Sequence, residues 1–189
     1  MTMKAKYLPI GITLAISSLF SACSNSWLDL NPSTAVPQDQ AMNTLEGMQA
    51  ALNGIYRQTS QHSYYGDNHW YYGDCRATDV QARVINKSRI VPYYTYNVQP
   101  TDNNNVVLPW NRPYLVIRQA NNLIQAINQY PSEKITPEIQ NIKAEALALR
   151  GLALFNLTRM YGMPYMNDNG ASLGVPIETV CRLMGHTKI

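Results

Sequence analysis

The stretch from Ala144 to Pro164 constrains the fold most, because it is the longest dense apolar run beyond the first two dozen residues. It is rich in Ala and Leu, which are strong helix formers, and it is too long for an ordinary strand. A helix that is apolar nearly all round must be buried nearly all round. The run therefore predicts a central helix covered by other helices. Gly162 is expected to end it in a left-handed cap, after which Pro164 prevents its continuation.

Two more segments have the apolar spacing of helices. Residues 43–60 are predicted to form a helix capped by Asn43 with Glu46. Residues 107–130 are predicted to form another, in which Pro113 fits the first turn if the helix begins near Asn111. The apolar positions recur every three or four residues: Met42, Leu45, Met48, Leu52 and Ile55 in the first segment, and Trp110, Tyr114, Ile117, Ala120, Ile124 and Ile127 in the second.

A short link separates the helix of residues 107–130 from the central helix. Thr136 can cap the central helix, and Pro137 suits its first position because a proline there loses no hydrogen bond. Two long helices joined by a short link form an antiparallel hairpin. The fold class that these patterns predict is all-α.

Residues 61–106 lack a helical apolar period and are predicted to form loops with short extended pieces. The chain has thirteen tyrosines against two phenylalanines, and the aromatic residues are densest within residues 64–74. Tyrosine suits half-exposed surfaces, because its ring packs while its hydroxyl takes a polar partner. This segment is therefore the best place in the sequence to look for a binding surface.

The best candidates for binding saccharides are Trp70, Tyr71 and Tyr72, with Asp67 and Asp74. The apolar face of a sugar ring stacks on an aromatic ring, while carboxylates accept hydrogen bonds from sugar hydroxyls. The alternative for each ring is that it packs the loops onto the helices, and the sequence leaves both roles open.

Other chemistries find little support. The net charge is only +3 and the basic residues are scattered, which disfavours nucleic-acid binding. The spacing of His62, Asp67, His69 and Cys75 fits no metal-site pattern, and residues 102–105 lack the glutamate of a calcium-binding EF-hand loop. No Gly-rich phosphate loop follows a strand. We therefore expect a binding protein, not an enzyme, with no cofactor and no metal.

Residues 1–23 resemble the export signal of a bacterial lipoprotein. Lys4 and Lys6 precede an apolar stretch at residues 7–20, which is too short to span a membrane. The segment ends in two small residues and Cys23, which resembles a lipobox and implies that Cys23 carries a lipid. The alternative is a signal cleaved elsewhere, with Cys23 incidental.

The order of these motifs resembles the N-terminal part of the SusD/RagB family of outer-membrane lipoproteins, over about residues 1–177. The resemblance implies an all-α fold of helix pairs like tetratricopeptide repeats, with long irregular loops. The stretch from Ala144 to Pro164 is the most specific match, although Gly151 and Leu154 depart from the family's usual residues. The matching stretches are Leu28–Pro32, Ala51–Tyr56, Trp110–Ile124 and Ala144–Pro164.

The same resemblance implies a function. The protein would be lipid-anchored in the outer membrane of a Bacteroidetes-type bacterium and would face the cell surface. It would bind glycans or other nutrients for polysaccharide utilisation and hand them to a TonB-dependent transporter of the SusC kind. The alternative is a structural or assembly lipoprotein that binds only its transporter.

Residues 178–189 resemble a different family. The segment around His186 is similar to one near the C-terminus of tyrosine recombinases (integrases), in which the matching histidine is catalytic. The arginines and the nucleophilic tyrosine of that family are absent, so no recombinase activity is expected. The expected parts are a lipoprotein signal at 1–23, a SusD-like helical domain at 24–177 and a foreign tail at 178–189, with a non-functional chimera as the alternative.

Members of the SusD/RagB family are longer than this chain, so the resemblance also implies a truncated helical array. An array of helix pairs needs capping units to cover the apolar face of its last pair. We therefore expect the isolated chain to be marginally stable or prone to aggregation.

Overall fold

The computed structural model describes residues 41–77, 79–81 and 89–179. The lipid-attachment site predicted at Cys23 and most of the tail predicted to be foreign lie outside these residues. The described part of the chain consists of helices, turns and irregular segments without any strand, which confirms the predicted all-α class. None of its helices is long and apolar enough to cross a membrane.

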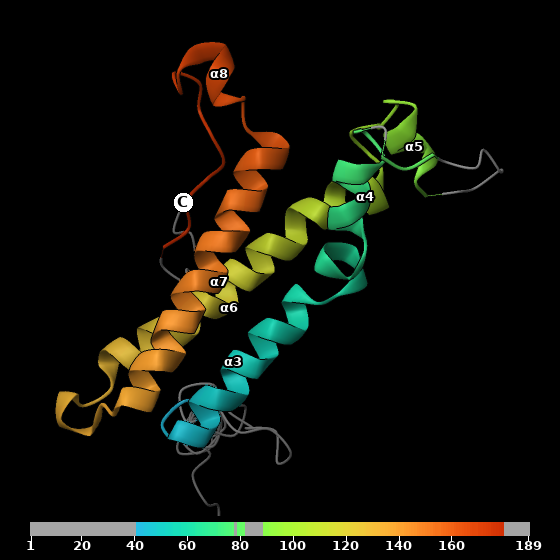
Figure 1. The fold of residues 1–189 in the computed structure, drawn as a ribbon. Helices are drawn as coiled ribbons and strands as arrows, with labels where there is room; N and C mark the ends of the chain where they lie inside the picture. The colour runs from blue at the N-terminus through green and yellow to red at the C-terminus, as the bar shows by residue number, and fades with distance from the viewer. Residues whose placement is uncertain (1–40, 78, 82–88, 180–189) are drawn as a thin grey trace, which may run out of the picture. The chain divides into compact units, whose positions relative to one another are not determined.

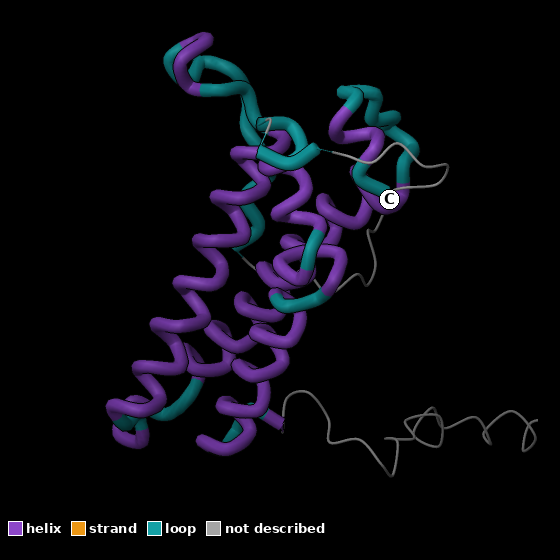
Figure 2. Tube along the Cα trace, turned by 45° about the vertical axis from the view of Figure 1, so that its right-hand side comes forward, coloured by secondary structure: helices purple, strands orange, loops and turns teal. Residues whose placement is uncertain are grey.

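Three long helices, α3 (Leu45–Thr59), α6 (Leu108–Gln129) and α7 (Pro137–Tyr161), lie side by side (Figures 1 and 2). The helices α6 and α7 form the predicted antiparallel hairpin through a short link that contains a 3-10 turn, Ser132–Lys134. As predicted, Thr136 caps α7, and its hydroxyl accepts a hydrogen bond from the Ile139 backbone N–H at 3.4 Å.

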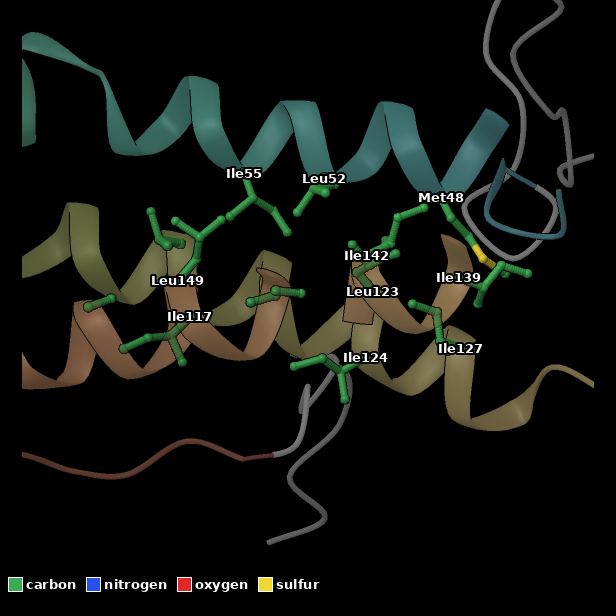
Figure 3. Close-up of a cluster of buried hydrophobic side chains, with 14 of the residues drawn as sticks. Met48, Leu52, Ile55, Ile117, Leu123, Ile124, Ile127, Ile139, Ile142 and Leu149 are labelled. Carbon is green, nitrogen blue, oxygen red and sulfur yellow. The ribbon is translucent and has the colours of Figure 1, made fainter. Parts of the chain in front are cut away.

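The hydrophobic core fills the space between these three helices. Figure 3 shows Met48, Leu52 and Ile55 of α3 pointing towards the other two helices. Each apolar stripe predicted for α3 and α6 supplies core residues, so tertiary burial explains why these segments are helical. The buried apolar residues of α6 and α7 are Val116, Ile117, Ala120, Leu123, Ile124, Ile127, Ile139, Ile142, Ala146, Leu149, Ala153 and Leu157.

The beginnings of α3 and α6 differ from the prediction. Thr44, not Asn43, caps α3, because its side chain accepts the Gly47 backbone N–H at 3.1 Å. The helix α6 matches the predicted range of 107–130 within one residue at each end, but it begins at Leu108 and not near Asn111, so Pro113 lies inside the helix and not in its first turn. Asn43 and Thr44 are adjacent in the sequence and both can cap a helix, so only the backbone conformation decides which of them caps α3.

Gly162 ends α7 in an extended conformation (φ −83°, ψ 162°), so the predicted left-handed cap was wrong. Glycine is needed there for space, since a Cβ atom at this position would lie only 2.6 Å from the Thr158 carbonyl oxygen. The chain then continues through Pro164 into the short helix α8 (Tyr165–Asp168).

The helix α7 is buried on one side only in the described part of the chain, so the prediction of burial nearly all round was wrong. Its other side carries Leu147, Leu152 and Phe155, which are 40%, 38% and 60% exposed. Between them lie the exposed small residues Ala144, Ala148 and Gly151. Spacings of three and four residues place these positions on one helix face. We call this surface the outer face of α7.

In its described part, the region predicted as loops with short extended pieces consists of short helical turns joined by loops, with no strand. These are π-helical turns at His62–Gly66 and Asn103–Val107 and the α-helices α4 (Asn68–Asp74) and α5 (Val91–Tyr94). Local side-chain bonds hold the second π-helical turn, since the Asp102 carboxylate accepts the backbone N–H groups of Asn104 and Asn105. Such bonds leave no apolar period in the sequence, which explains the wrong prediction.

Candidate functional site

The predicted saccharide-binding residues lie on or next to α4, but they do not form a single face. Trp70, Tyr71 and Tyr72 are consecutive in a helix, so their side chains leave the helix axis about 100° apart. Trp70 is half exposed, whereas Tyr71 and Tyr72 are partly buried. The three rings therefore meet different surroundings.

Trp70 belongs to an aromatic cluster with Tyr65 and His69. Its ring lies nearly perpendicular to that of Tyr65, at 74° and with 5.8 Å between the centroids. The indole N–H donates to the Tyr65 backbone carbonyl oxygen at 2.8 Å. Because 52% of Trp70 is still exposed, the indole ring is held in place and is accessible to a ligand.

Asn156 of α7 holds this cluster against the three-helix core. Its side-chain amide donates to the Tyr64 hydroxyl at 2.8 Å and to the Tyr65 hydroxyl at 2.9 Å. Asn156 and Tyr64 are almost completely buried, and burial raises the pKa of Tyr64 to about 12. Tyr64 is therefore a packing residue.

His69 is buried against Arg159 of α7, which donates a hydrogen bond to the imidazole Nε2 at 2.9 Å. Burial, and secondly the charge of Arg159, lowers the pKa of His69. The neutral imidazole accepts from Arg159 at Nε2 and carries its proton on Nδ1. Protonation of Nε2 would abolish this contact.

The two predicted carboxylates do not converge. Asp67 pairs with Arg89 at 3.1 Å and with His62 at 2.5 Å, so its Oδ2 atom is already occupied. Asp74 is exposed at the other end of α4, roughly 10 Å along the helix axis at 1.5 Å per residue. Among the described residues, no three acidic, histidine or cysteine side chains gather as a metal site.

Tyr72 lines a cavity of about 250 Å³, which we call the tyrosine cavity. It is formed by the end of α4, the α5 segment, the second π-helical turn and the end of α7 (α4 and α5 are labelled in Figure 1). Drug-sized ligands occupy roughly 300–1,000 Å³, so this cavity suits one small ring. Its lining residues are Tyr72, Arg76, Tyr93, Tyr96, Val98, Asn105, Val106, Met160 and Tyr161.

Arg76 lies against two tyrosine rings of this cavity. Its guanidinium carbon is 4.9 Å from the centroid of Tyr72 and 5.3 Å from that of Tyr96, both within the range of a cation–π interaction. The Tyr96 hydroxyl donates to the Arg76 backbone carbonyl oxygen at 2.5 Å. The two residues thus hold each other in place.

Tyr96 has a strained backbone. Its φ is +55°, in the left-handed region that residues with a Cβ rarely adopt, and its side chain is 65% exposed. Strain of this kind gathers at ligand sites, where the surroundings enforce it. A strained backbone together with an exposed ring whose hydroxyl is bonded to Arg76 marks Tyr96 as a candidate binding residue.

The wall of the tyrosine cavity is rigid. Tyr93 is buried, stands edge-on to Tyr72 at 85° and donates to the Asn105 carbonyl oxygen at 2.9 Å. The Tyr72 hydroxyl donates to the Met160 carbonyl oxygen at 3.2 Å. Burial raises the pKa of Tyr93 and of Tyr161, so both hydroxyls stay neutral at physiological pH.

Sequence reasoning missed Arg76 and Tyr96 as site residues. Tyr72 and Arg76 are four residues apart, which makes them neighbours on a helix, but this signal has meaning only when α4 is known to be helical. Tyr96 approaches them from a turn in which its own φ is positive, and no residue type in that turn indicates a positive φ.

Comparison with known proteins gives consistent matches across the described residues. A family model, SusD-like, described as starch-binding and associating with the outer membrane, matches residues 26–182. The crystal structure of a SusD superfamily protein from Bacteroides thetaiotaomicron is similar, with a TM-score of 0.70 and 62% identity over 76% of this chain and 32% of the other.

A second crystal structure, that of a putative sugar binding protein from Bacteroides vulgatus, has a TM-score of 0.64 and 33% identity, with the same coverage of 76% and 32%. The chain thus spans about a third of the length of both proteins. No curated protein matches it.

Proposed function

The chain belongs to the SusD-like family, and we propose that it binds saccharides at the tyrosine cavity. The observation that carries the proposal is the arrangement of Tyr72, Arg76 and Tyr96, in which two tyrosine rings enclose a guanidinium group next to a cavity. The family's description as starch-binding supports the class of ligand.

The chemistry of this cavity suits a sugar ring. The exposed ring of Tyr96 offers an apolar face for the C–H groups of a pyranose, and the guanidinium of Arg76 offers several N–H donors for sugar oxygens. The hydrogen bond from the Tyr96 hydroxyl to the Arg76 carbonyl oxygen holds the ring before the ligand arrives, which lowers the entropic cost of binding.

The lining of the tyrosine cavity favours binding over catalysis. Glycoside hydrolysis generally needs two carboxyl groups, placed about 5–10 Å apart across the scissile bond. The lining residues of the cavity include no carboxylate, histidine or thiol. Capture of an intact saccharide is therefore the activity that we propose.

The proposed location is the outer membrane, with a lipid on Cys23 and the helical domain facing the cell surface. The proposed partner is a TonB-dependent transporter of the SusC kind that receives the saccharide. The family's description as associating with the outer membrane supports this location.

The test is a binding titration of the full chain, purified in detergent, against a panel of neutral and acidic oligosaccharides. Replacement of Tyr96 by Ala should abolish binding. The matched control is Tyr165→Ala, because Tyr165 is equally exposed, at 68%, but lies on α8. Unchanged affinity in Tyr96→Ala, or equal losses in both variants, would refute the assignment of the site.

A structural or assembly role is the second candidate, and the outer face of α7 favours it. Leu147, Leu152 and Phe155 give this face the apolar character of a protein interface. Co-purification with a TonB-dependent transporter, together with no affinity for any saccharide, would support this role over saccharide capture.

A further inference from the structure

We propose that the tyrosine cavity selects saccharides that carry an acidic group, and that Arg76 binds this group. The proposal rests on the proposed saccharide binding and adds the charge of the ligand. A carboxylate of a uronic acid and a sulfate ester share the required chemistry, which is a planar or tetrahedral oxyanion with at least two free oxygen atoms.

Arg76 is positioned by rings and not by an acid. The faces of Tyr72 and Tyr96 lie against its guanidinium group, and both ion pairs found among the described residues involve Asp67 instead. The donors along the edge of the Arg76 guanidinium group take part in none of the side-chain hydrogen bonds between described residues. Within the described residues, the N–H groups of Arg76 are therefore left for an acceptor that enters the cavity.

Three other arginines of the described chain have polar partners. Arg89 binds Asp67 at 3.1 Å, and Arg159 binds His69 at 2.9 Å. Arg150 donates to the side-chain oxygen of Asn121 at 3.0 Å. These arginines serve contacts within the fold, whereas Arg76 combines exposure, fixed orientation and a position in the wall of a cavity.

No nearby acid neutralises Arg76 within the cavity. The lining contains no carboxylate, and the carboxylate of Asp102 is taken up by the two backbone N–H groups and the side-chain amide of its own turn. Burial keeps the hydroxyls of Tyr93 and Tyr161 protonated, so no tyrosinate opposes an anion. Arg76 is therefore the only charged side chain among the described lining residues. The Asp102 carboxylate lies outside the lining and keeps its charge, which adds to the effect of burial in raising the pKa of Tyr93.

The guanidinium fork matches an oxyanion better than it matches a hydroxyl group. Arginine binds carboxylate and sulfate-like groups through two parallel N–H···O bonds, and such charge-assisted bonds are about twice as strong as neutral ones. Contact with the two tyrosine rings restricts the guanidinium group and reduces the entropy lost on binding. We expect the acidic member of a matched ligand pair to bind about tenfold more tightly, which corresponds to about 1.4 kcal/mol.

The experiment uses matched neutral and acidic disaccharides: galactose-, glucose- and mannose-based pairs in which the acidic member carries a uronate, and a second series in which it carries a sulfate ester. The full chain in detergent is titrated with each ligand by calorimetry at low and at high salt. The uronate and sulfate series show which oxyanion is preferred. High salt should reduce the difference in affinity between the acidic and the neutral member of each pair, because screening weakens an exposed charge pair.

Arg76→Met should weaken the binding of the acidic member of each pair about tenfold more than that of the neutral member, so that the acidic preference is lost, whereas Arg76→Lys should keep part of the preference. Arg118→Met is the matched control, because Arg118 is an exposed arginine of α6 outside this cavity. Circular dichroism confirms that each variant folds as the unaltered chain does.

The outcomes separate the two proposals. Equal affinity for both members of every pair, or a preference that survives Arg76→Met, overturns the acidic selectivity and leaves saccharide binding standing. Absence of binding to every ligand of both series overturns the proposed function, and this proposal with it.

Discussion

Replacement of Asn156 by Ala should destabilise the chain strongly, although Asn156 is a single polar residue of α7. The residue is 1% exposed and donates to the hydroxyls of Tyr64 and Tyr65. These two hydrogen bonds attach the aromatic cluster around Trp70 to the three-helix core.

The expected loss follows from two contributions. Each of the two hydrogen bonds has a net value of about 1 kcal/mol, and the buried Tyr64 hydroxyl, left without a partner, costs about 1–3 kcal/mol more. The free energy of unfolding of Asn156→Ala should therefore fall by about 3 kcal/mol. Tyr64→Phe removes the hydroxyl together with its need for a partner, so it should cost only about 1 kcal/mol.

The assay is urea unfolding of residues 24–189, followed by far-ultraviolet circular dichroism. Thr158→Ala is the control, because Thr158 is exposed on the same helix and bonds only to the backbone of Leu154; its effect should stay within about 0.5 kcal/mol. The double variant of Asn156 and Tyr64 should lose about 2 kcal/mol less than the sum of the single losses, because the shared hydrogen bond is lost only once and no Tyr64 hydroxyl is left without a partner. A loss below about 1 kcal/mol for Asn156→Ala would refute the reasoning.

Three other predictions concern stability and association. Thr136→Ala removes the cap of α7 and should lower the free energy of unfolding by about 1 kcal/mol; an unchanged urea midpoint would contradict this. Because burial lowers the folded-state pKa of His69, the unfolded chain binds more protons below about pH 6.5, so stability should fall between pH 7 and pH 5. Urea titrations of His69→Gln should show a weaker fall, and an identical fall would argue against the burial of His69. Phe155→Ser should reduce self-association in sedimentation velocity, since Phe155 dominates the exposed outer face of α7, and undiminished association would show that this face is not responsible.

The three-helix core was predictable because the residues that are buried in it recur every three or four positions in the sequence. Every third or fourth residue of α3 and α6 had to be apolar to reach the core, and Thr136 with Pro137 marked the start of α7. The apolar composition of α7 predicted a helix correctly but not its surroundings. Composition does not distinguish a face that is covered from a face such as that of Leu147 and Phe155, which the described residues leave exposed.

The candidate site was predictable only in part. The density of tyrosines pointed to the region around α4, and Tyr72 does line a cavity. The position of Arg76 next to Tyr72 depends on a helical turn that has no apolar period in the sequence. The position of Tyr96 depends on its own positive φ. The Tyr72–Arg76 pair can be recognised only once residues 68–74 are known to be helical, and Tyr96 reaches Arg76 from 20 residues away in the sequence. Residue types at short range reveal neither.

The central claim is that saccharides bind at the tyrosine cavity, and amide chemical-shift mapping by nuclear magnetic resonance tests it most directly. Labelled chain is titrated with the tightest-binding saccharide of the panel. The account predicts shifts centred on Arg76, Tyr96 and Asn105. A second hollow, lined by Phe155 and Tyr165, offers aromatic rings as well. Shifts confined to that hollow, with Arg76 and Tyr96 unmoved, would contradict the account.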